Sequence, residues 1–177
     1  MKFELQPILE NEIVKLIPLK EEDFETLFEV SSDPLVWEQH PNKDRYIREV
    51  FKNFFKGAME SKGAFLIYDN KTGKVIGSTR FYYPAETSNT IAIGYTFFAR
   101  DHWGSTYNQA VKKMMLEYAF QFVDKVHFHI GSENIRSQKA IEKSGAVKID
   151  EKEISYYGEK ESKNYIYQID KKRFFKK

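Results

Sequence analysis

The chain has 177 residues, which suits one domain over residues 1–177, and the absence of cysteine excludes disulfides, thiolate metal sites and a cysteine nucleophile. Its 28 Lys and Arg residues against 26 Asp and Glu leave a formal charge of +2, far from the basic balance typical of nucleic-acid binding. Apolar runs fall well short of the roughly 18 residues of a membrane span, and the N-terminus lacks a signal-peptide pattern. We expect a cytoplasmic protein without a membrane or nucleic-acid partner.

Aromatic side chains are in excess, at 16% of the chain, with 15 Phe and 11 Tyr. Such rings most often fill a hydrophobic core. They can also line a cleft for an organic ligand, and only their positions in the fold can separate the two interpretations.

The first half of the chain indicates a strand, two helices and a hairpin. Glu12–Leu19 is a short apolar run closed by proline, and helical spacing of apolar residues follows from Lys20 to Val30 and again from Pro41 to Lys62. The period then changes to that of strands in Ala64–Tyr68 and Lys74–Tyr83, which a turn-forming segment joins into a hairpin.

The second half alternates strands and helices. Its longest helix is amphipathic, with Met114 and Tyr118 on the apolar face and Lys112 and Lys113 on the polar face. Together with the first half, this order predicts an α/β (α+β) domain in which helices pack on a mixed sheet. The predicted elements are strand Thr90–Phe98, helix Thr106–Phe122, strand Lys125–Ile130, helix Asn134–Ser144 and strands Val147–Tyr156 and Tyr165–Ile169.

The junction between strand Thr90–Phe98 and the following helix reads R-D-H-W-G-S-T-Y-N. The first amides of a helix have no partner within it and lie at the positive end of its dipole. Gly104 to Asn108 can therefore hold a phosphate or pyrophosphate on backbone N–H groups. A turn with glycine and a Ser or Thr cap is also an ordinary way to begin a helix.

A second segment, S-E-N-I-R-S-Q-K-A-I-E-K-S-G-A, places Asn134 and Ser137 on one turn at the end of a strand. Taken together, the W-G-x-x-Y-N and N-x-R-S-x-x-A-x-x-x-x-G-A segments resemble the GNAT superfamily of acetyl-CoA-dependent N-acetyltransferases. Within it they look most like the branch of the ribosomal-protein N-terminal (alanine) acetyltransferases. The resemblance implies a mixed, mostly antiparallel sheet of about seven strands flanked by helices, with splayed central strands.

The resemblance also implies where acetyl-CoA binds. The main chain of the strand end would hold the pantetheine arm, the following turn would cradle the pyrophosphate, and Asn134 and Ser137 would face the pantetheine side. Only the first glycine of the family's turn is kept, because Thr106 and Asn108 stand where glycine or alanine is usual. The implied cofactor residues are Phe97, Phe98, Ala99, His102, Trp103, Gly104, Ser105, Thr106, Tyr107, Asn108, Asn134, Ser137 and Lys139.

Two of these assignments have an alternative. His102 precedes Trp103 in the turn, where it is expected to contact the cofactor, with proton transfer as the alternative. Lys139, like Arg136 and Lys143 on the same helix, either approaches the 3′-phosphate of coenzyme A or belongs to a solvated basic face.

The catalytic groups are less clearly marked. The tyrosine that serves the family as general acid aligns with Ile141, so Ser137 is the natural substitute for protonating the leaving thiolate, unless it only caps its own helix. His127 and His129 alternate with apolar residues on one strand and are candidate bases or ordinary strand residues. His40 is a further candidate in a loop. No third ligand accompanies the histidine pair at a recognisable spacing, so no metal is expected.

The predicted function is direct acetyl transfer from acetyl-CoA to a primary amine, either a protein or peptide N-terminus or a small molecule. A site without a conspicuous base favours an α-amine, whose deprotonation at neutral pH costs about 1 kcal/mol, against roughly 4–5 kcal/mol for a lysine amine. The alternative is a non-catalytic module of the same fold that binds acyl-CoA. The sequence leaves the choice between monomer and homodimer open.

Overall fold

The structure is a computed structural model that describes residues 2–84 and 88–176. Its strands are β1 (Leu9–Glu10), β2 (Val14–Pro18), β3 (Ala64–Asp69), β4 (Val75–Tyr82), β5 (Thr90–Phe98), β6 (Lys125–Gly131), β7 (Val147–Ser155) and β8 (Glu161–Asp170). The α-helices are α1 (Phe24–Ser31), α2 (Arg48–Ser61), α3 (Ser105–Ala119), α4 (Ile135–Lys143) and α5 (Lys171–Phe174). Short 3₁₀ turns span Glu21–Asp23, Pro34–Trp37 and Arg100–His102.

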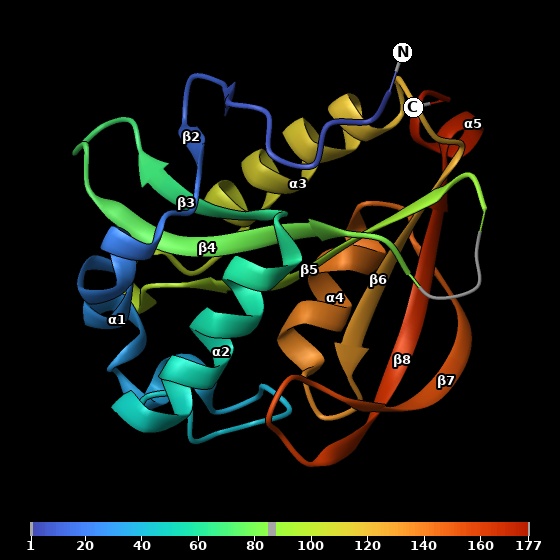
Figure 1. The fold of residues 1–177 in the computed structure, drawn as a ribbon. Helices are drawn as coiled ribbons and strands as arrows, with labels where there is room; N and C mark the ends of the chain where they lie inside the picture. The colour runs from blue at the N-terminus through green and yellow to red at the C-terminus, as the bar shows by residue number, and fades with distance from the viewer. Residues whose placement is uncertain (1, 85–87, 177) are drawn as a thin grey trace.

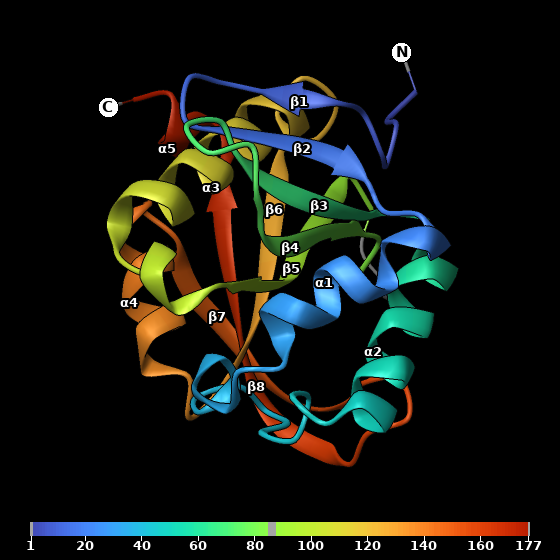
Figure 2. The ribbon, with the colours of Figure 1, turned by 90° about the vertical axis from the view of Figure 1, so that its left-hand side faces the viewer.

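In the described residues, eight strands form one sheet in the order β1-β2-β3-β4-β5-β6-β8-β7 (Figure 1). Neighbouring strands are antiparallel except for β5 and β6, which are parallel. Helices α1 and α2 cover one face of the sheet, and α3 and α4 cover the other (Figure 2). The predicted mixed and mostly antiparallel α/β fold is confirmed.

One additional strand and two element starts differ from the prediction for reasons that the local structure shows. β1 has only two residues, too few for a period to show in the sequence. Helix α2 begins at Arg48 rather than Pro41, because the Asn42 side chain accepts a hydrogen bond from the Asp44 amide at 2.9 Å and holds the chain in a turn. β8 begins at Glu161 because its polar first residues pair with β7.

Most of the aromatic excess lies in the core. One hydrophobic cluster fills the space between the sheet and α3, and a second fills the space between the sheet and helices α1 and α2. Burying each of these rings contributes on the order of 2–3 kcal/mol. The largest fully buried aromatic side chains are Trp37, Phe51, Phe65, Phe81, Phe97 and Phe120.

The two central strands diverge, as predicted. β5 and β6 pair only from Thr90 to Ala92, opposite Lys125 to His127, although β5 continues to Phe98. The register of β4 against β5 also shifts near Arg80, an irregularity that increases twist. The sheet therefore splits between β5 and β6. In the described residues no helix is long and apolar enough to cross a bilayer.

Candidate functional site

A cavity of about 350 Å³ lies where β5 and β6 separate. Its walls come from Gly94–Phe98 of β5, Phe128–Gly131 of β6, and side chains of α3 and α4. Arg45 and Tyr156, which belong to the opposite face of the sheet, also line it. The cavity therefore reaches both faces of the sheet through the split.

The end of β5 supplies main-chain groups to this cavity. After Ala92 the edge of β5 that faces β6 has no strand partner, so donors and acceptors on that edge are available to a ligand. Phe97 and Phe98, for which main-chain contacts to a pantetheine arm are predicted, line the cavity. Ala99 lies outside the lining, and its amide donates to the Ile76 carbonyl at 2.8 Å.

The turn between β5 and α3 presents free helix amides. The N-cap of α3 is Gly104, and none of the described side chains caps the helix there, so the first-turn amides lack that partner. Gly104 has φ of 108° and ψ of −175°, a backbone conformation that essentially only glycine adopts. Glycine, and not Ser or Thr, occupies the N-cap position, which suits the anion-binding interpretation.

The predicted cofactor residues of this turn separate into two groups. His102, Trp103, Gly104 and Asn108 line the cavity. Tyr107 instead points toward β3, and the exposed Thr106 lies outside the lining. Ser105 begins the helix, and its side chain lies outside the described part of the structure.

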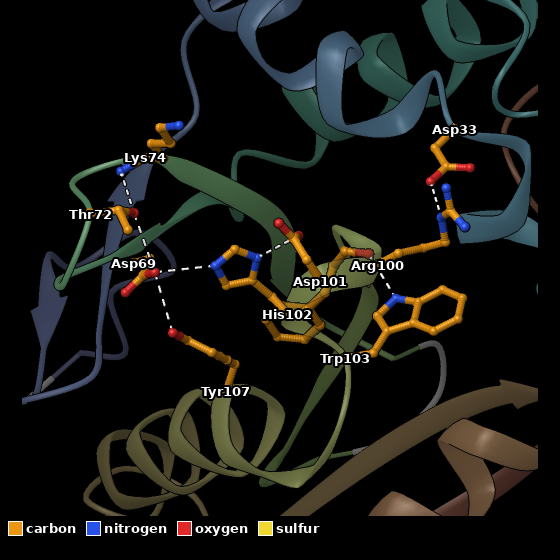
Figure 3. A network of polar contacts seen from close by, with 10 residues as sticks. Asp33, Asp69, Thr72, Lys74, Arg100, Asp101, His102, Trp103 and Tyr107 are labelled. Atoms are coloured by element: carbon orange, nitrogen blue, oxygen red, sulfur yellow. Dashed lines mark hydrogen bonds and ion pairs between the residues drawn. The ribbon is translucent and has the colours of Figure 1, made fainter.

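His102 is held by two carboxylates (Figure 3). Its Nδ1 lies 2.8 Å from Asp101, and its Nε2 lies 3.1 Å from Asp69, which also accepts from the Tyr107 hydroxyl at 3.3 Å. Burial works against the charge of Asp69, but hydrogen bonds from the Lys71 amide and from His102 among others outweigh it and lower the pKa of Asp69. This network ties the turn before α3 to the end of β3.

Trp103 is fixed between β5 and α4. Its indole Nε1 donates to the Phe98 carbonyl at 3.0 Å. The guanidinium of Arg136 stacks on the indole, 3.8 Å from the ring centroid. The side of the cavity near α3 and α4 therefore combines free amides with cationic side chains, Lys139 among them, and suits a phosphate-bearing ligand.

Helix α4 is capped by Asn134 rather than by Ser137. The Asn134 side chain accepts from the Ser137 amide at 3.2 Å, which leaves the Ser137 hydroxyl without a capping role. Both residues line the cavity. Ile141 is 3% exposed and belongs to the hydrophobic core cluster. This position therefore supplies no hydroxyl in place of the family's tyrosine.

The structure separates the two predicted histidines. His127 lies where β6 still pairs with β5, outside the cavity lining, and its Nε2 is 2.9 Å from Gln168. His129 follows the split and lines the cavity, 5.7 Å from the Tyr82 ring. Burial, followed by the charges of His127 and Lys152, lowers the pKa of His129 to about 4, which makes it a weak base.

The prediction that Lys112 lies on the solvated face of its helix is wrong. Lys112 was expected on the polar face of α3, but it is 8% exposed and lines the cavity. Its Nζ donates to the Thr96 hydroxyl at 2.6 Å, and burial lowers its pKa to about 7. No sequence signal marks it, because a lysine on the polar face of a helix is normally solvated.

Four further polar side chains of the cavity, which the sequence did not single out, come from four separate segments. Arg45 precedes α2, Tyr82 ends β4, Tyr95 lies in β5, and Tyr156 follows β7. Neither spacing nor motif connects them. Among the described residues, no group of three or more His, Asp or Glu side chains is arranged to hold a metal ion.

Comparison with known proteins identifies relatives of this architecture. A family model described as "Acetyltransferase (GNAT) domain" matches residues 14–147. A GCN5-related N-acetyltransferase from Brucella melitensis superposes with a TM-score of 0.81 at 17% identity, over 96% of this chain and 80% of that one.

Two further solved structures carry coenzyme A. Mycobacterium smegmatis RimJ in complex with CoA-disulfide gives a TM-score of 0.71 at 14% identity, over 96% of this chain and 88% of that one. Spermidine N-acetyltransferase from Vibrio cholerae in complex with CoA and spermine gives 0.66 at 14% identity, over 93% and 99%. At these identities the likeness shows the fold alone.

Proposed function

Because the chain belongs to the GNAT acetyltransferase family, we propose that it transfers the acetyl group of acetyl-CoA directly to a primary amine of a small molecule or of a peptide or protein N-terminus. The observation that carries this proposal is the cavity at the split between β5 and β6. On one side the cavity contacts the unpaired edge of β5 and the N-terminus of α3. On the other side it is lined by a separate group of side chains that includes Arg45, Tyr95 and Tyr156. Two substrates can therefore meet inside the sheet.

On the coenzyme side, the residues present fit a phosphate-bearing thioester. The first-turn amides of α3 would bind the pyrophosphate, and Arg136 and Lys139 would offset its charge. The main chain of Phe97 and Phe98 would hold the pantetheine arm along the unpaired edge of β5. His102 would act mainly by keeping the turn in place, because both of its ring nitrogens already have partners.

The reaction requires that the amine lose a proton and the departing thiolate gain one. The amine nitrogen attacks the thioester carbonyl, the carbon–sulfur bond then breaks, and no covalent intermediate with the protein is needed. Ser137 supplies a hydroxyl on the coenzyme side for the thiolate. Lys112 suits proton acceptance better than His129 at neutral pH, because a general base works best when its pKa lies near the operating pH.

The experiment that tests this function measures free thiol release from acetyl-CoA in the presence of a panel of primary amines. The proposal predicts release that depends on both acetyl-CoA and an amine, with an N-acetylated product found by mass spectrometry. Thiol release that does not require an amine would contradict it.

One observation favours a second candidate, a module that binds acyl-CoA without turnover. Ile141 puts an apolar side chain where the family's general acid is expected. Saturable acetyl-CoA binding with no acetylated product across the whole amine panel would support this second function over the first.

A further inference from the structure

Arg80 is a buried cation that forms no ion pair with a carboxylate among the described residues. It lies on β4 with 5% of its surface exposed, and its Nε has no hydrogen-bond partner in the described part of the chain. Its guanidinium stacks 3.7 Å from the centroid of the Tyr95 ring, which lines the cavity, and lies 5.6 Å from that of Phe54. Burial lowers the pKa of Arg80 only to about 10, so the side chain stays charged at neutral pH.

The neighbouring arginine is different because a carboxylate already balances it. Arg45 donates to both carboxylate oxygens of Glu159 at 2.7 Å, and the two side chains are 3% and 4% exposed. Arg45 lies over the Phe54 ring at 4.9 Å and the Tyr156 ring at 5.5 Å, so it shares the aromatic surroundings of Arg80. Two guanidiniums and one carboxylate leave one positive charge uncompensated.

The remaining groups around this charge are neutral. Burial raises the pKa of Tyr82, Tyr95 and Tyr156, so these phenols keep their protons. His129, with a pKa of about 4, and His40, whose pKa burial lowers to about 3, are uncharged at pH 7. Among the described residues that line the cavity there is no Asp or Glu. The carboxylate of Glu159 nearby is already paired with Arg45, so among the described residues that line the cavity no free carboxylate is available to a cation.

An unpaired buried charge is costly to a fold, and a substrate of opposite charge offsets that cost. On the basis of the proposed function, we infer that the acceptor amine carries an oxyanion, a carboxylate or a phosphate, which the charge of Arg80 and the hydroxyls of Tyr82 and Tyr95 select. Polycationic amines lack that group and meet only cations and neutral side chains here. Arg80 stacks on Tyr95 and does not itself line the cavity, so it is a positioning residue that acts through Tyr95.

Matched acceptors test the inference. Thiol release is measured with β-alanine against propylamine, with O-phosphoethanolamine against ethanolamine, and with spermidine. We expect the oxyanion member of at least one pair to have a kcat/KM at least about tenfold higher than the partner that lacks the oxyanion, mainly through KM, and spermidine to be a poor acceptor. The pair with the larger ratio tells whether the anion is a carboxylate or a phosphate. Equal values within both pairs would overturn the inference.

Variants at Arg80 make the test specific. Arg80→Met should abolish the preference within the matched pair, and Arg80→Lys should restore part of it, because lysine keeps the charge. Folding should survive in both, since the guanidinium has no ion pair to lose, and thermal unfolding should show an unchanged or higher midpoint for Arg80→Met. Arg48→Met is the matched control, because Arg48 pairs with Glu25 on the exposed side of α2.

Failure of the inference can be told apart from failure of the proposed function by calorimetry without turnover. Binding of N-acetyl-β-alanine, N-acetyl-O-phosphoethanolamine and uncharged N-acetylpropylamine is compared in the wild type and in Arg80→Met. Tighter binding of either anion that Arg80→Met abolishes would support the anion site even if no amine were acetylated. Acetylation of propylamine and spermidine as efficient as that of the anionic amines would leave the acetyltransferase intact and refute the anion site.

Discussion

Lys112 is the side chain whose protonation depends most on the fold around it. In the unfolded chain its pKa is near 10.4, and burial lowers it to about 7 in the folded protein. Between these two values the unfolded state binds more protons, so the free energy of unfolding rises with pH. We predict that stability rises by about 2 kcal/mol between pH 7 and pH 9 from this residue alone.

Denaturant unfolding at the two pH values checks this prediction. Lys112→Met should remove the rise, whereas Lys113→Met, at a neighbouring position whose side chain is 73% exposed, should keep it. A rise of equal size in Lys112→Met would show that another group is responsible. The same variant should lower the acetylation rate most at neutral pH if Lys112 accepts the proton of the amine.

A substitution at Gly104 tests the cost of its backbone conformation without adding a steric clash. A Cβ added there meets no atom within 4 Å, so Gly104→Ala changes only the cost of φ at 108°. We predict a loss of about 1–3 kcal/mol of stability, or a turn that relaxes away from this conformation, and in either case weaker acetyl-CoA binding.

The matched control is Gly73→Ala, which has φ of 71°, no atom near the added Cβ and a position in the β3–β4 turn outside the cavity lining. It should lose stability without losing acetyl-CoA affinity by calorimetry. Equal affinity losses in both variants would argue against a role of the Gly104 turn in binding.

At the scale of elements, one ion pair joins two segments that flank the cavity. Arg45 lies before α2 and Glu159 lies in the turn between β7 and β8, which approach each other below α2 in Figure 1. Removing one member of a buried pair leaves an unpaired charge. We predict that Glu159→Gln lowers the free energy of unfolding by about 3–5 kcal/mol.

Chemical denaturation measures this loss directly. Glu25→Gln is the control, because its ion pair with Arg48 has side chains that are 71% and 45% exposed, and solvent screening leaves such a pair with little effect on stability. A change of similar size in the two variants would contradict the structural importance of the buried pair.

Strands and helices were largely predictable because each carries its own period. β5 begins and ends where its β-branched and aromatic run does, at Thr90 and Phe98. Helix α2 was placed several residues too early, because an apolar period does not show that Asn42 holds the preceding segment in a turn. Polar pairing at the start of β8 was missed for a similar reason, since no apolar pattern marks an exposed strand end.

At the scale of the whole molecule, the cofactor side of the cavity was accessible from the sequence and the acceptor side was not. Trp103, Gly104, Asn134 and Ser137 lie in two continuous motifs, and the cavity brings those motifs together. Arg80 gives no local signal, because its surroundings come from distant parts of the chain that meet only in the folded protein. His129 lines the cavity and His127 does not, and this difference likewise depends on where β5 separates from β6.

Binding of acetyl-CoA in the split sheet can be measured by calorimetric titration of the purified protein with acetyl-CoA, with an unrelated nucleotide as control. We predict saturable binding at one site per chain, weakened in Gly104→Ala and unchanged in Gly73→Ala. Absence of both heat and thermal stabilisation at millimolar acetyl-CoA would contradict it.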